Sequence, residues 1–87
     1  MKFSIIIPTY NEEANIEECL QSILSQNYPR NDFEIIVSDG SSSDRTVPIA
    51  QQYADKVVVD SKRGIAHGRN FGAQHASGEI LVFVDCD

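Results

Sequence analysis

Short apolar runs alternate with amphipathic segments along this chain. Four runs rich in β-branched residues predict strands, at residues 3–7, 33–38, 56–60 and 79–84. Between them, apolar residues recur at helical spacing and predict helices at residues 12–27, 45–54 and 65–76. Strands that alternate with helices are typical of βαβ units, so the pattern predicts an α/β fold with a parallel sheet and right-handed crossovers.

Local signals refine three of these elements. Asn11 can cap the first helix, whose opening turn carries two acidic residues where the helix dipole favours negative charge. Gly68 and Gly72 lie inside the third helix. Because each interior glycine costs about 1 kcal/mol relative to alanine, they indicate close packing or the approach of a ligand. The last strand contains an uninterrupted apolar run at residues 80–84, which predicts burial on both of its faces.

Composition restricts the chain to a small globular class. Its 87 residues allow one domain. Thirteen acidic residues against seven basic ones give a net charge of −6, whereas a domain that clamps duplex nucleic acid usually has the opposite balance. We therefore expect no nucleic-acid partner. An acidic chain of this kind binds phosphate only through a local positive feature, such as an arginine, a helix N-terminus or a metal ion.

Targeting and redox signals favour the cytoplasm. No apolar run approaches the roughly 18 residues that cross a bilayer, and the N-terminus resembles no signal peptide. Cys19 and Cys86 lack the number and spacing of a disulfide framework or a zinc site. We expect a cytoplasmic protein, with the cytoplasmic face of a membrane as an option for a longer chain.

Polar clusters follow three of the four predicted strands, at residues 8–12, 39–44 and 85–87. Parallel sheets bind ligands beyond the carboxyl ends of their strands, near the topological switch point. We therefore expect the three clusters to meet on one rim. Asp85 and Asp87, two residues apart after an apolar strand, supply the hard oxygen ligands that suit Mg²⁺ or Mn²⁺, although a solvated acidic segment is the simpler interpretation.

The other clusters also allow two interpretations each. Tyr10 and its polar neighbours can stack and hydrogen-bond a base, or form an ordinary loop. Asp39 can accept from the imide N–H of uracil or from a ribose hydroxyl, or belong to a serine-rich turn that caps the next helix. Arg69 suits a diphosphate, or lies on the surface of a tightly packed helix. His67 and His75 are interpreted as surface or packing residues.

Four ordered motifs, at residues 5–12, 34–44, 64–72 and 76–87, resemble the nucleotide-binding half of a family 2 glycosyltransferase with the GT-A fold. The resemblance implies a Rossmann-like, three-layer α/β/α sandwich with parallel strand order 3-2-1-4. It also implies binding of a nucleoside-diphosphate sugar, commonly a UDP-sugar, together with Mg²⁺ or Mn²⁺. Ser38 and Gly68 depart from the family pattern, which often has an acid and an alanine at these positions.

The resemblance assigns roles to individual residues. Glu12 would face the ribose, Asp39 would read the base, and Arg69 would face the diphosphate. The nucleotide-binding residues it implies are Pro8, Thr9, Tyr10, Glu12, Asp39, Ser41, Arg69 and Asp85, and the metal-binding residues are Asp85 and Asp87.

Family members continue well beyond this last motif, into a half that carries the acceptor pocket and a carboxylate base. Residues 1–87 are therefore expected to be the donor-binding half of an inverting enzyme, with no assignable base and little or no sugar transfer by themselves. The acceptor is unknown. Two alternatives remain open: a stand-alone nucleotide-binding module, and a structural fragment that forms homo-oligomers through the edge of its last strand. An unrelated nucleotidyltransferase is a weaker alternative.

Overall fold

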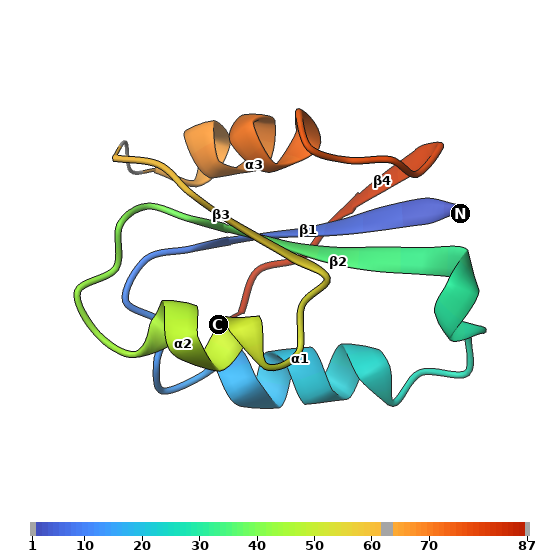
Figure 1. Cartoon of the computed structure of the whole chain (residues 1–87), viewed down its shortest axis with the longest axis horizontal. Coiled ribbons are helices and arrows are strands. Elements are labelled where there is room, and N and C mark those ends of the chain that lie inside the picture. Colours follow the sequence, from blue (N-terminus) through green and yellow to red (C-terminus); the bar gives the residue numbers. More distant parts are fainter. Residues whose placement is uncertain (1, 62–63, 87) are drawn as a thin grey trace.

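The computed structural model describes residues 2–61 and 64–86 and contains one four-stranded parallel sheet with the order β3-β2-β1-β4. The strands are β1 (Phe3–Thr9), β2 (Phe33–Asp39), β3 (Lys56–Val59) and β4 (Ile80–Phe83). The helices are α1 (Ile16–Leu24), α2 (Thr46–Gln51), α3 (Ile65–Ala73) and a short 3₁₀ turn, η1 (Arg30–Asp32). Figure 1 shows α1 and α2 on one face of the sheet and α3 on the other, which confirms the predicted three-layer architecture and strand order.

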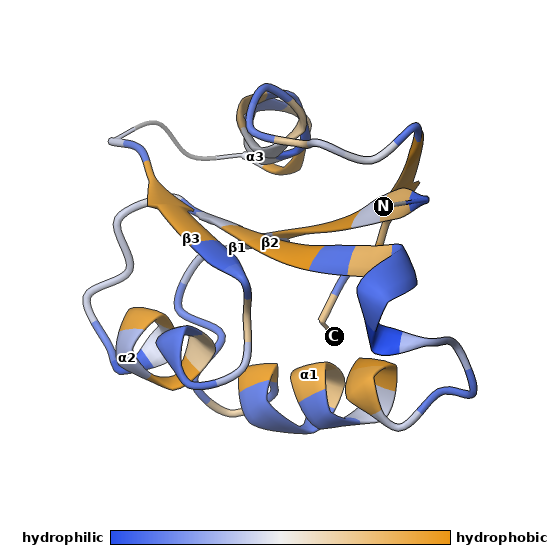
Figure 2. Ribbon diagram, turned by 45° about the vertical axis from the view of Figure 1, so that its right-hand side comes forward, coloured by the Kyte–Doolittle hydropathy of each residue, from blue (hydrophilic) through white to orange (hydrophobic). Residues whose placement is uncertain are grey.

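The two central strands form the core of the molecule. β1 and β2 pair in parallel along their whole length, from Phe3 opposite Phe33 to Thr9 opposite Asp39. Figure 2 shows hydrophobic residues concentrated in the strands and hydrophilic ones in many of the connecting loops. The buried side chains that pack between the sheet and α1 and α2 are Ile5, Ile7, Ile16, Leu20, Phe33, Ile35, Val37 and Ala50.

Two glycines allow α3 to lie directly against β1. A Cβ atom added at Gly68 would stand 2.8 Å from the Cβ of Pro8, and one added at Gly72 would stand 2.6 Å from Cγ2 of Ile6. Both distances are shorter than real carbon–carbon contacts, so close packing explains the two glycines. The first turns of α3 are thereby brought to the carboxyl end of β1.

The helices are shorter than the periodicity predicts. α1 begins at Ile16 rather than at residue 12, and Asn11 is not its cap. Asn11 has a φ of 52°, and its side-chain oxygen accepts the backbone N–H of Ser43 at 2.9 Å. α2 ends at Gln51 rather than at 54, and α3 ends at Ala73 rather than at 76. None of these helices has the length and apolar character needed to cross a bilayer, within the described residues.

The prediction of a doubly buried fourth strand is wrong for this structure. The four side chains of β4 are between 38% and 59% exposed. β4 lies at the edge of the sheet and pairs only with β1 among the described strands. An apolar run indicates full burial only when the strand is paired on both sides and covered on both faces, and β4 is paired on one side alone among the described strands.

A buried carboxylate fixes the amino ends of the strands. Glu34 on β2 is 2% exposed. Its Oε2 accepts two hydrogen bonds, one from the hydroxyl of Ser4 and one from the backbone N–H of Ser77, each at 2.6 Å. The ammonium of Lys56 lies 3.2 Å from the other carboxylate oxygen. Burial raises the pKa of Glu34, but these hydrogen bonds and the lysine charge outweigh burial and hold that pKa below its ordinary value. The cluster ties β1, β2 and β3 to the segment that precedes β4.

We predict that Glu34→Gln lowers the free energy of unfolding by about 2 kcal/mol near neutral pH, since hydrogen bonds to a charged group are lost. The pKa of Glu34 is lowered on folding. Its stabilisation is therefore present above the unfolded glutamate pKa of about 4.3 and is lost as the pH falls through the folded-state value. Urea unfolding followed by circular dichroism should show the two proteins converging in acid. Exposed Glu18→Gln is the matched control, and a difference that does not change with pH contradicts the prediction.

Candidate functional site

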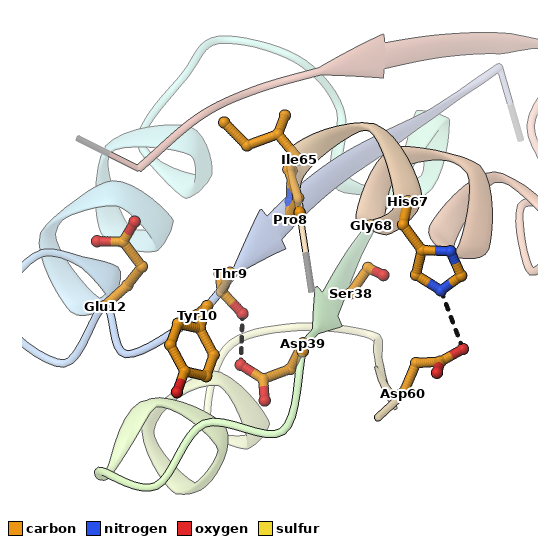
Figure 3. Close-up of a pocket in the computed structure, with 12 residues that line it drawn as sticks. Pro8, Thr9, Tyr10, Glu12, Ser38, Asp39, Asp60, Ile65, His67 and Gly68 are labelled. Atoms are coloured by element: carbon orange, nitrogen blue, oxygen red, sulfur yellow. Dashed lines mark hydrogen bonds and ion pairs between the residues drawn. The ribbon is translucent and has the colours of Figure 1, made fainter. Parts of the chain in front are cut away.

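A cavity of about 190 Å³ opens at the carboxyl ends of β1 and β2, beside the start of α3 (Figure 3). It is smaller than the roughly 300–1,000 Å³ of sites that bury a whole drug-sized ligand, so its size suits one part of a larger ligand. Its lining residues come from the ends of β1 and β2, the loops that follow β1, β2 and β3, and the start of α3. They are Pro8, Thr9, Tyr10, Glu12, Ser38, Asp39, Gly40, Asp60, Gly64, Ile65, His67 and Gly68.

Asp39, the last residue of β2, is one of the residues that line this cavity. Its side chain is buried, and Oδ1 accepts hydrogen bonds from the hydroxyl of Thr9 at 2.7 Å and from the hydroxyl of Ser42 at 2.6 Å. Oδ2 accepts the backbone N–H of Ser42 at 2.7 Å. A carboxylate has about four acceptor positions. Asp39 can therefore accept one further hydrogen bond, through Oδ2, from a ligand in the cavity.

The loops after β1 and β2 hold each other in place. The N–H of Asn11 donates to the hydroxyl of Ser42 at 2.8 Å, and the N–H of Ser43 donates back to the side chain of Asn11. One residue further on, the N–H of Glu12 donates to the hydroxyl of Thr46 at 2.8 Å. These bonds compensate for the left-handed backbone of Asn11. They also fix the two residues that flank it, Tyr10 and Glu12, on the wall of the cavity.

Asp44 strengthens the same junction. Its carboxylate accepts the hydroxyl of Thr46, the N–H of Thr46 at 2.9 Å and the N–H of Glu13 at 3.2 Å. The Thr46 hydroxyl, followed by these backbone donors, holds the pKa of Asp44 below its ordinary value against a smaller opposing effect of desolvation. In return, the carboxylate of Glu13 accepts the N–H of Arg45 at 3.0 Å. The loop geometry around Tyr10 is thus set by reciprocal hydrogen bonds.

The structure brings five of the sequence-predicted residues into the cavity: Pro8, Thr9, Tyr10, Glu12 and Asp39. Tyr10 is 37% exposed and offers a ring against which a planar base can stack. Ser41 does not line the cavity. It lies beside it with a φ of 65°, and its hydroxyl donates to the backbone oxygen of Asp60 at 2.8 Å.

Arg69 and Asp85 form a second group outside the cavity lining. The guanidinium of Arg69 lies 3.4 Å from Oδ2 of Asp85 and 5.7 Å from the ring centre of Phe83. The Nε of Arg69 is buried and has no hydrogen-bond partner, which is uncommon for a donor in a folded protein. Asp87, the other predicted metal-binding residue, lies outside the described residues.

Sequence reasoning missed the wall formed by Asp60 and His67. Asp60 directly follows β3, and the Nε2 of His67 on α3 lies 3.2 Å from Oδ2 of Asp60. The position of Asp60 directly after β3 is a usable signal, because the candidate residues in the other loops also follow the carboxyl ends of strands. His67 carried no such signal, since its place depends on how closely Gly68 packs against Pro8.

Comparisons with known proteins agree with this geometry. The sequence matches the family Glycosyl transferase family 2 over residues 4–87. Glycosyltransferase AglE of Haloferax volcanii is 40% identical over 90 residues, which cover 97% of this chain and 30% of AglE. The structure of Staphylococcus aureus TarS in complex with UDP-GlcNAc matches this chain with a TM-score of 0.93 and 39% sequence identity. The match covers 100% of this chain and 27% of the TarS chain.

A second solved structure has the same arrangement. Mannosyltransferase PcManGT from Pyrobaculum calidifontis, in complex with GDP-Man and Mn²⁺, has a TM-score of 0.91 at 37% identity, covering 99% of this chain and 27% of that one. The chain thus spans less than a third of the length of each of these proteins. Within that span, the match includes the sheet, the helices and the loops around the cavity. The chain belongs to glycosyl transferase family 2 and has the GT-A arrangement of strands and helices.

Proposed function

We propose that this chain binds the nucleoside diphosphate of a sugar nucleotide, namely a UDP-sugar, as the donor-binding part of a glycosyltransferase. One observation carries the proposal. The carboxylate of Asp39 accepts three of the about four hydrogen bonds it can accept, and it lines the same cavity as the aromatic ring of Tyr10. Together they match a planar base with an imide N–H, as uracil has. The complex of the related TarS with UDP-GlcNAc supports the same assignment.

In the proposed complex, each part of the nucleoside meets a different residue. The uracil ring stacks on Tyr10 and donates its imide N–H to Oδ2 of Asp39. Glu12, on the same wall of the cavity, faces the ribose hydroxyls and accepts from them. Thr9 and Pro8 complete the wall at the end of β1. Ser41 acts indirectly, because its hydroxyl holds the backbone of Asp60.

Arg69 and Asp85 are proposed to hold the diphosphate end of the donor. A phosphate oxygen would satisfy the orphaned Nε of Arg69. Among the described residues no three His, Cys, Asp or Glu side chains gather into a metal site. Mg²⁺, however, is commonly bound by one or two carboxylates together with substrate phosphates. Asp85 fits that mode, with Asp87 as the second proposed ligand, for Mg²⁺ or Mn²⁺. A metal ion held by these carboxylates would supply positive charge to the leaving diphosphate.

The proposed reaction is a single displacement with inversion. The oxygen of an acceptor hydroxyl attacks the anomeric carbon, its proton passes to a carboxylate base, and the nucleoside diphosphate leaves with the electrons of the broken bond. No described residue is assigned as that base. We therefore propose that these 87 residues bind the donor and transfer little sugar by themselves. We also propose a cytoplasmic location, a reducing compartment in which cysteines such as Cys19 and Cys86 stay outside disulfides.

Self-association is a second candidate role, favoured by one observation. The edge strand β4 exposes Ile80, Leu81, Val82 and Phe83, together with the unpaired backbone groups of a sheet edge. Such an edge is a template for pairing with another chain. A second copy of this chain is the occupant we propose for it, and this role is compatible with nucleotide binding.

For the donor site, Asp39→Asn is expected to weaken UDP binding in the presence of Mn²⁺ by roughly tenfold or more, because it removes the charged acceptor of the imide N–H. Isothermal titration calorimetry measures the change, and circular dichroism confirms that the variant is folded. Asp32→Asn, at the opposite end of β2, is the matched control and should bind UDP as the wild type does. Equal affinity of wild type and Asp39→Asn contradicts the proposed base contact.

For the diphosphate, Arg69→Gln is expected to weaken UDP binding by roughly tenfold while leaving the weaker binding of uridine unchanged. The reason is that Arg69 lies outside the cavity that holds the nucleoside. Titrations of UDP and uridine against the same protein samples separate the two contributions. Equal losses for UDP and uridine would place Arg69 in the nucleoside site and contradict the assignment.

For the edge strand, static light scattering across a concentration series is expected to show a mass that rises above the 9.7 kDa of one chain. Leu81→Lys should reduce this rise, because charged residues block edge-to-edge pairing. A mass of one chain at every concentration would contradict self-association.

A further inference from the structure

One wall of the cavity is assigned no contact with the nucleotide in the proposed complex. It consists of His67 on α3 and Asp60 after β3, whose side chains lie 3.2 Å apart. In Figure 3, Tyr10 lies on one side of Asp39, and the His67–Asp60 pair lies on the other. Tyr10, Asp39 and the His67–Asp60 pair all line the same cavity, so the pair borders the space in which a base would bind.

The histidine ring is held from two sides. Asp60 contacts its Nε2, and the ring of Phe71, one helical turn further along α3, lies nearly parallel to it at 6.0 Å with an interplanar angle of 11°. A Cβ atom at the neighbouring Gly68 would stand only 2.8 Å from the Cβ of Pro8, so this part of α3 lies close against β1. His67 is thus an oriented side chain rather than a mobile surface one, and about a third of it remains exposed to the cavity and solvent.

The distance of this wall from Asp39 is set by the backbone. The N–H of Asp60 donates to the backbone oxygen of Asp39 at 2.9 Å, and Ser41 donates to the backbone oxygen of Asp60 at 2.8 Å. Asp60 therefore cannot retreat from Asp39 without loss of both bonds. The backbone of Asp60, whose side chain pairs with His67, is therefore held beside the end of β2.

We propose that His67, positioned by Asp60, limits the size of the nucleobase and makes this chain select a pyrimidine over a purine. This inference rests on the proposed function. The fold alone does not decide the base, since the related TarS and PcManGT structures contain UDP-GlcNAc and GDP-Man respectively. The cavity has a volume of about 190 Å³, below the roughly 300–1,000 Å³ of sites that bury a whole ligand, and the side chain of His67 forms part of its wall. Specificity then comes from exclusion of the wrong base.

The test compares UDP with GDP, each with Mn²⁺, by titration into the ¹⁵N-labelled chain with detection by NMR, which also measures weak binding. Wild type is expected to bind UDP roughly tenfold or more tightly than GDP, the scale on which the size of an apolar pocket discriminates. His67→Ala should gain affinity for GDP, so that the UDP/GDP ratio falls by roughly tenfold. His67→Phe keeps a ring of similar bulk and should keep the wild-type ratio.

His75→Ala is the matched control, because His75 follows the same helix but does not line the cavity. It should leave the ratio unchanged, and the dispersion of the NMR spectrum shows whether each variant is folded. If UDP binds and the ratio is the same in wild type and His67→Ala, or if His67→Phe relaxes it as much as alanine does, the inference is overturned while the proposed function stands. If wild type binds neither nucleotide, the proposed function fails and the inference fails with it.

Discussion

The register between β1 and β2 is the constraint on which the rest of this structure depends. It places Ser4 opposite Glu34 at one end and Thr9 opposite Asp39 at the other, and in both pairs the hydroxyl donates to the carboxylate. The two pairs are five positions apart along each strand, an odd number, so they lie on opposite faces of the sheet. A slip of one residue would break both pairs and turn the apolar side chains of the strand to the wrong face. The same register thus fixes the core, the amino end of the sheet and the cavity.

The two carboxylates of β2 have different consequences because their surroundings differ. Glu34 is fully engaged by Ser4, Ser77 and Lys56, and it acts as a structural anchor for the segment that leads into β4. Asp39 is buried as deeply, but it faces a cavity and keeps an acceptor position. A buried hydrogen-bond acceptor that borders a cavity is the arrangement expected of a group that recognises a ligand by hydrogen bonding. Hydrogen bonds between the loops around Asp39 hold these loops together.

Much of the fold and part of the site could be predicted from the sequence. The alternation of strands and helices predicts the layers, and the loops after β1 and β2 contain Tyr10 and Asp39, which the structure brings into one cavity. Non-local contacts could not be predicted. Asn11 was interpreted as a helix cap because its sequence neighbours fit that role, yet its side chain bonds Ser43 in another loop. His67 reaches the cavity only through the contact of Gly68 with the sheet.

The central claim is that the cavity after β1 and β2 holds the base of a UDP-sugar and that Asp39 accepts a hydrogen bond from this base. A crystal structure of this chain with UDP and Mn²⁺ tests the claim most directly. The account predicts a uracil ring stacked on Tyr10, with its imide nitrogen within hydrogen-bond distance of Oδ2 of Asp39. A uracil ring bound elsewhere, or one whose imide edge faces away from Asp39, would contradict it.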